Sequence, residues 1–210
     1  RRQRQMCIRD STTASSGQCL VMISDDAERT MCTDLGISAS LADRDLDEAQ
    51  LSKAEIYYVE GYLSSSEEGT AAAMAAHTVA SANNVRTAVS LSDISMVTIF
   101  KENLLRILGN GVHSLFCNEE EALSWASTDR LDVAIAELKD IAQEVYITLG
   151  ANGSAVIDQA GHQQQAPGLA VSPIDTNGAG DIYAGACLAA RSQGAETVSY
   201  THLTLPTTLV

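Results

Sequence analysis

The chain has 210 residues and a formal net charge of -14, from 13 basic and 27 acidic side chains. Apolar residues make up 45% of it and charged residues 19%, which suits one domain with a packed core and excludes a disordered chain. The acidic balance argues against sequence-independent nucleic-acid binding, and no apolar run approaches the roughly 20 residues that a membrane-spanning helix needs.

The five cysteines have no CxxC spacing, so they predict neither a zinc site nor a disulfide scaffold. We therefore expect reduced thiols in a cytoplasmic protein, acting on a small molecule without nucleic-acid or membrane partners.

The two ends differ in composition from the rest of the chain. Residues 1–11 are rich in arginine, and residues 198–210 carry no formal charge. The basic start could be a signal-peptide n-region or a nucleic-acid-binding arm. No apolar stretch follows it, as a signal peptide would require. Both strings resemble translated sequencing-adapter DNA, and we expect them to be artefacts that flank a domain over residues 12–197.

The middle of the chain alternates strand-like and helix-like patterns. Residues 18–24 and 29–34 predict a hairpin around a polar turn at 25–28. Strands are predicted at 56–59, 85–91, 112–117 and 145–149, and helices near 45–54, at 67–82, over 97–108, from 118 and at 131–142. Such alternation predicts an α/β fold with a mainly parallel sheet, whose ligands bind beyond the carboxyl ends of the strands.

The most informative motif is DTNGAGD at residues 175–181, which opens a predicted helix. Glycines at 178 and 180 let backbone N–H groups converge on an anion, where the partial positive charge of the helix N-terminus adds to them. A carboxylate at Asp181 beside that site suits the removal of a proton from a hydroxyl nucleophile during phosphoryl transfer. The alternative is a glycine-rich turn with an aspartate cap.

This motif resembles the second signature of the PfkB (ribokinase-like) carbohydrate kinases, and within that family it is most similar to the bacterial adenosine kinases. The resemblance implies that Asp181 is the catalytic base and that the amides of Gly178, Ala179 and Gly180 form the anion hole. It also assigns Thr176 to nucleotide binding and suggests potassium activation through Asp175.

Three other segments are similar to the same family. Asn118 to Glu121 matches its NxxE motif, which implies that both residues organise Mg²⁺ and that Asn118 also faces the nucleotide, although the spacing is equally that of a helix capping box. Thr148, Gly150 and Gly153 match a nucleotide-binding TLGxxG segment, or an ordinary hairpin turn. Residues 12–36 resemble the lid strands.

The resemblance places Gly17, Gly61 and Tyr62 on the substrate side, and it makes a homodimer through the lid strands an expectation. Family members begin with a strand and a Gly-Gly/Asn motif, and they end in an adenine loop. Neither is found here, so we expect a ribokinase-like fold incomplete at both ends. No GxxxxGK[ST] loop, HExxH or GxSxG motif occurs, which excludes P-loop, zincin and serine-hydrolase chemistry.

The sequence therefore predicts an ATP- and Mg²⁺-dependent kinase of a sugar hydroxyl, first of all the ribose 5′-hydroxyl of adenosine or a similar nucleoside. A kinase of fructose, ribose or ketodeoxygluconate and a catalytically inert fragment are the alternatives, together with a sugar-binding protein without chemistry.

Overall fold

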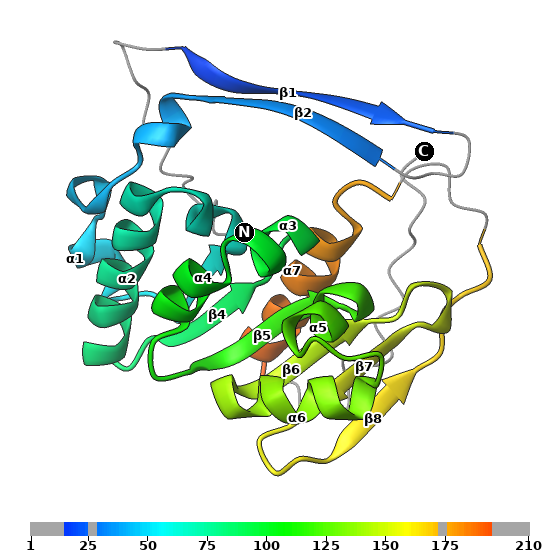
Figure 1. Cartoon of the computed structure of the whole chain (residues 1–210). Helices are drawn as coiled ribbons and strands as arrows, with labels where there is room; N and C mark the ends of the chain where they lie inside the picture. The colour runs from blue at the N-terminus through cyan, green and yellow to red at the C-terminus, as the bar shows by residue number, and fades with distance from the viewer. Residues whose placement is uncertain (1–14, 25–28, 172–175, 195–210) are drawn as a thin grey trace.

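The computed structural model describes residues 15–24, 29–171 and 176–194. Six strands form one sheet in the order β3-β4-β5-β6-β7-β8, and β1 and β2 form a separate two-stranded sheet (Figure 1). The strands are β1 Ser16–Ile23, β2 Arg29–Gly36, β3 Ile56–Glu60, β4 Arg86–Ser90, β5 Val112–Asn118, β6 Ala142–Thr148, β7 Ser154–Ile157 and β8 Gln163–Ala166. The α-helices are α1 Glu48–Leu51, α2 Glu67–Ala82, α3 Ile94–Ile99, α4 Lys101–Leu108, α5 Glu119–Trp125, α6 Leu131–Ile141 and α7 Ala179–Ser192.

The main sheet confirms the expected α/β architecture. Strands β3 to β6 are parallel neighbours, and at least one helix lies between each of them and the next along the chain. Strands β7 and β8 extend the sheet in antiparallel pairing. The sequence did not predict these two strands, because β7 has only four residues and the QQQA of β8 has no apolar pattern.

Alternating strand residues pack against helices on opposite faces of the sheet. On one face Val89, Leu115 and Val145 lie in a large core with side chains from α2, α4, α5 and α6. On the other face Phe116 and Tyr146 stack with their ring centroids 4.6 Å apart and pack with Ala184 and Cys187 of α7. Helix α7 therefore occupies a different face of the sheet from the other long helices.

Two helical predictions were too long. The segment near 45–54 contains only the four-residue α1, and a 3-10 turn at Asp43–Asp45 precedes it. The apolar spacing over 97–108 belongs to α3 and α4, which are separate because Phe100 leaves helical geometry at φ -113° and ψ 23°. Both segments do contain helix, as predicted, but the spacing of apolar residues does not show where the backbone leaves helical geometry.

The two-stranded sheet confirms the predicted hairpin. Ser16 pairs with Gly36 and Ile23 with Arg29, while the turn at 25–28 lies outside the described residues. Large apolar side chains on it remain exposed, among them Leu20 at 63% and Met22 at 48%. Within the described residues, no helix combines the length and apolar character that crossing a membrane requires.

Candidate functional site

The residues singled out in the sequence lie mainly at one edge of the main sheet. Gly61 follows the last residue of β3, Asn118 ends β5 and Thr148 ends β6. These strands are parallel, so their carboxyl ends meet at the same edge. The topology therefore brings the three segments to the edge at which α/β proteins bind ligands.

The glycines of the DTNGAGD motif form the start of α7. Gly178 adopts the left-handed conformation, with φ 74° and ψ 5°, and Ala179 donates its N–H to the Thr176 carbonyl oxygen at 3.2 Å. The next amides lie in the first turn of a 14-residue helix, where no intrahelical acceptor is available. A Cβ placed on Gly180 would have no atom within 4 Å, so the approach to this turn is open.

Asp181 is the third residue of α7. The aspartate cap considered in the sequence is therefore absent here, because Gly178 occupies the cap position. Its side chain is exposed. The pKa of the Tyr58 hydroxyl on β3 is raised well above its ordinary value, mainly by burial, and the Asp181 charge contributes to this rise. Asp181 therefore lies close enough to β3 to act electrostatically on it.

Asn118 and Glu121 form the capping box that their spacing allowed. The Asn118 side chain accepts from the Glu121 N–H at 2.7 Å, and the Glu121 carboxylate accepts from the N–H and Nδ2 of Asn118, both at 3.0 Å. Glu121 is only 5% exposed. The described residues contain no cluster of three acidic, histidine or cysteine side chains able to hold a metal ion.

This geometry limits what the pair can offer to Mg²⁺. Both carboxylate oxygens of Glu121 already accept hydrogen bonds from Asn118. The arrangement therefore fits contact with a hydrated ion through water and does not fit direct ligation. Mg²⁺ commonly keeps several of its waters in proteins, so the water-mediated arrangement is chemically reasonable.

The Thr148 to Gly153 segment is a tight turn between β6 and β7. The Leu149 N–H donates to the Gly153 carbonyl oxygen at 2.8 Å. Gly153 has φ 91°, and a Cβ there would lie 1.9 Å from the Ala166 carbonyl oxygen. Gly150 also has a positive φ, 56°, but open space beside it. The hairpin alone thus explains Gly153, whereas Gly150 leaves room for a ligand.

Gly61 is fixed by close contacts with backbone carbonyl groups. A Cβ on it would lie 2.7 Å from the carbonyl oxygens of both Ser90 and Leu91. Its N–H donates to the Ser92 hydroxyl at 2.7 Å, and Tyr62 donates its hydroxyl to the Ser92 carbonyl oxygen at 3.2 Å. Tyr62 is 41% exposed, so part of its side chain borders solvent at this edge.

Glu60 and Ser92 were not proposed as site residues from the sequence. Ser92 adopts φ 69°, which is uncommon for a residue other than glycine, and its hydroxyl donates to the Glu60 carboxylate at 2.6 Å. The parallel register of β3 and β4, which pairs Glu60 with Ser90, brings the two together. The sequence could have indicated Glu60 as a site residue, because it is a carboxylate at the end of a predicted strand and glycine follows it.

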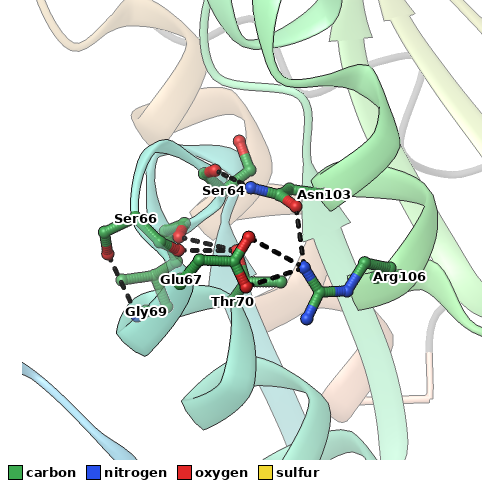
Figure 2. Close-up of polar contacts among 8 residues, drawn as sticks. Ser64, Ser66, Glu67, Gly69, Thr70, Asn103 and Arg106 are labelled. Atoms are coloured by element: carbon green, nitrogen blue, oxygen red, sulfur yellow. Dashed lines mark hydrogen bonds and ion pairs between the residues drawn. The ribbon is translucent and has the colours of Figure 1, made fainter.

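A polar cluster fixes the turn that contains Gly61 and Tyr62 (Figure 2). Asn103 of α4 donates from Nδ2 to the Ser64 carbonyl oxygen at 2.9 Å. Arg106 of the same helix donates to both carboxylate oxygens of Glu67, at 3.1 and 2.9 Å. Ser66 caps α2 by accepting from the Gly69 N–H at 3.0 Å. Helix α4 therefore anchors the turn from outside the site.

Gly17 lies in β1 and so belongs to the two-stranded sheet, apart from the sheet that holds the other site residues. A Cβ on it would lie 2.6 Å from the Leu35 carbonyl oxygen, so strand packing alone explains the glycine. Asp175, to which potassium activation was tied, lies outside the described residues, as do the adapter-like segments 1–11 and 198–210.

Comparison with known proteins gives relatives that are named as adenosine kinases or as a probable sugar kinase. Adenosine kinase of Schizosaccharomyces pombe is 27% identical over 200 residues, which cover 87% of this chain and 58% of that protein. The crystal structure of adenosine kinase from Sinorhizobium meliloti has a TM-score of 0.84 at 28% identity. That of a probable sugar kinase from Rhizobium etli also has a TM-score of 0.84, at 25% identity. Each of the two structural matches covers 89% of this chain and 57% of the other.

The chain thus spans little more than half the length of these relatives. The model of the pfkB family carbohydrate kinases matches residues 4–199, a range that includes all of the described residues. The chain therefore belongs to the pfkB family of carbohydrate kinases.

Proposed function

We propose that this chain is the phosphotransferase part of a kinase that moves the γ-phosphoryl group of ATP to the ribose 5′-hydroxyl of adenosine or a related nucleoside. The observation that supports it most is the start of α7, where an exposed carboxylate, Asp181, follows directly on the glycine turn of Gly178 to Gly180.

In the proposed reaction the Asp181 carboxylate accepts the proton of the attacking hydroxyl. The hydroxyl oxygen forms its bond to phosphorus as the bond to the leaving ADP oxygen breaks. The amides of Gly178 and Gly180, with the partial positive charge of the α7 N-terminus, stabilise the negative charge on the transferring group. Ala179 donates its N–H to the Thr176 carbonyl oxygen, so this amide holds the turn, and the Thr176 side chain stays assigned to the nucleotide.

Mg²⁺ accompanies ATP in this proposal and supplies neutralisation of charge on the phosphates. Asn118 and Glu121 would face the hydrated ion through water, in keeping with the capping box that occupies their oxygens. Gly150, with open space beside it, would border the nucleotide next to Thr148 and Gly153.

Adenosine is the proposed acceptor because the curated relative from Schizosaccharomyces pombe and the structural relative from Sinorhizobium meliloti are both named adenosine kinases. A free sugar or sugar acid is the second candidate, since the probable sugar kinase has the same TM-score. On the acceptor side we assign Gly61 and Tyr62, with Glu60 added from the geometry, and Gly17 from the two-stranded sheet. A cytoplasmic location and a homodimer through β1 and β2 belong to the same proposal.

The test is release of ADP from ATP and Mg²⁺ by the purified chain, with adenosine, ribose, fructose or ketodeoxygluconate as acceptor. We expect turnover that depends on the acceptor and is fastest with adenosine. Faster turnover with a sugar would replace the first candidate by the second. Binding of an acceptor in a calorimeter without ADP release would contradict a kinase and leave an inert fragment or a sugar-binding protein.

A further inference from the structure

The edge of the main sheet opposite the candidate site contains a cavity of about 50 Å³. Its lining comes from the first residues of β3, β4, β5 and β6, from the turn after β7 and from the last turns of α7. A water molecule needs roughly 10–15 Å³ of such volume, so the cavity can hold a ligand of about four non-hydrogen atoms.

The buried acidic group of this cavity is already satisfied. Glu144 is 7% exposed and accepts from Arg191 Nη2 at 2.5 Å and from the Tyr146 hydroxyl at 3.0 Å. The Ser114 hydroxyl lies 3.5 Å from the same carboxylate. The negative charge of Glu144 is therefore matched by Arg191, and its oxygens have hydrogen-bond donors.

Among the remaining polar groups of the cavity, Arg86 and His113 supply hydrogen-bond donors, beside the side chains of Gln143 and Gln159, which can both donate and accept. His113 accepts at Nδ1 from the Thr87 N–H at 3.1 Å, so in the neutral ring the proton is on Nε2, which can donate. Arg86 donates from one nitrogen, Nη2, to Glu55 at 2.8 Å. Glu55 is 59% exposed, so that ion pair holds Arg86 only weakly. The other N–H groups of the guanidinium can serve a ligand.

The rest of the lining is apolar except for Gln143 and Gln159. Ile56 of β3, Ala88 of β4 and Leu188 of α7 border the same space. A carboxylate with a short apolar tail matches donors on one side and apolar side chains on the other, and it forms paired hydrogen bonds with a guanidinium. A phosphate ion has no apolar part with which to use Ile56, Ala88 and Leu188.

We infer that this cavity, here named the amino-edge cavity, binds a small monocarboxylate through Arg86 and His113. The inference does not depend on the proposed kinase activity, because none of these residues belongs to the candidate site at the carboxyl ends of the strands.

The experiment is an NMR titration of the ¹⁵N-labelled chain with acetate, at constant ionic strength. We expect saturable shifts of the Thr87 and Ser114 amides, which belong to the strand ends around the cavity. Phosphate should shift them less at equal concentration. Saturable shifts confined to the Gly180 amide would place anion binding at the start of α7 and overturn the inference, as would a larger response of Thr87 to phosphate.

Three substitutions extend the test, so that its result does not depend on whether any one variant folds. Arg86→Gln should weaken acetate binding about tenfold or more, because it removes charge-assisted hydrogen bonds. Glu55→Gln should tighten it by about two- to fivefold, because it releases Arg86 from a weak surface pair. Arg130→Gln, at an exposed pair with Asp132, is the matched loss of charge and should change nothing. Equal affinity in wild type, Arg86→Gln and Glu55→Gln would overturn the inference.

Discussion

At the carboxyl ends of the parallel strands, the key side chains and turns are held largely by backbone groups, and Asp181 stays exposed. At the amino ends, the Glu144 carboxylate accepts hydrogen bonds from Arg191 and from Tyr146, and both Glu144 and Tyr146 are buried. Helix α7 spans both ends, with Asp181 in its first turn and Arg191 in its last. If the proposed function is correct, changes to exposed groups at the carboxyl ends should reduce catalysis, whereas changes at the amino ends should reduce stability.

The strongest test of this difference is Asp181→Asn, which rests on the proposed function. Loss of a general base lowers the rate of phosphoryl transfer by about 10²–10⁴. The free energy of unfolding should stay unchanged, because the side chain is exposed. ADP release and urea denaturation measure the two quantities. Asp140→Asn, an exposed carboxylate of α6, is the control and should retain both. Loss of stability in parallel with activity would break the comparison.

The carboxyl end also contains a residue on which the fold depends. Gly153→Ala places a Cβ against the Ala166 carbonyl oxygen at a positive φ, and we expect a loss of about 3 kcal/mol in the free energy of unfolding. Gly150→Ala, in the same turn but beside open space, should cost only about 1 kcal/mol. Equal losses in the free energy of unfolding, measured by urea denaturation, would show that the close contact with Ala166 is not what excludes a side chain at position 153.

At the amino end, Arg191→Gln leaves the Glu144 carboxylate buried without its charged partner. Removal of one partner of a buried ion pair costs about 3–5 kcal/mol, and because Arg191 is 31% exposed we expect a smaller loss, about 2 kcal/mol. Arg130→Gln removes the same charge from an exposed pair and should leave the midpoint of urea denaturation unchanged. A loss that is the same for both variants would show that burial of Glu144 is not decisive.

Local patterns in the sequence predicted much of the fold. The alanine-rich helix expected at 67–82 is α2, with Ser66 as its cap, and each predicted strand is present within three residues of its expected ends. The start of α7 and the capping box of Asn118 were equally readable, because each lies within a few consecutive residues.

The rest depends on contacts between distant parts of the chain. Glu60 meets Ser92 only because β3 and β4 pair in parallel register. Glu144 and Arg191 are 47 residues apart and join through the packing of α7 on the sheet. Strand β8 has a polar sequence, and its place as the edge strand beside β7 rather than its composition makes it a strand.

A smaller effect is expected for Tyr183, which lies between the two ends of α7. In the described part of the chain its buried hydroxyl makes no well-formed hydrogen bond, although Ser154 and Cys187 lie beside it. Tyr183→Phe removes the cost of that unsatisfied group and should raise the free energy of unfolding by about 1 kcal/mol. Tyr146→Phe removes a hydroxyl that donates to Glu144 and should lower it by about 1 kcal/mol. The same sign in both variants would contradict this contrast.

The smallest expected effect is a pH dependence at the amino end. Burial and the charges of Arg86 and His77 lower the pKa of His113, against an opposing contribution from Glu144. In the unfolded chain the ring takes up its proton near pH 6.5, and in the folded chain only at lower pH. The unfolded state therefore binds more protons below about pH 6.5, and His113 reduces the free energy of unfolding as the pH falls through that range.

His113→Gln keeps an acceptor for the Thr87 N–H but does not titrate, so its stability should fall less steeply between pH 7 and pH 5.5. Urea denaturation at several pH values, with the exposed His162→Gln as control, measures the slopes. An unchanged slope in His113→Gln would remove His113 from the pH response of this edge.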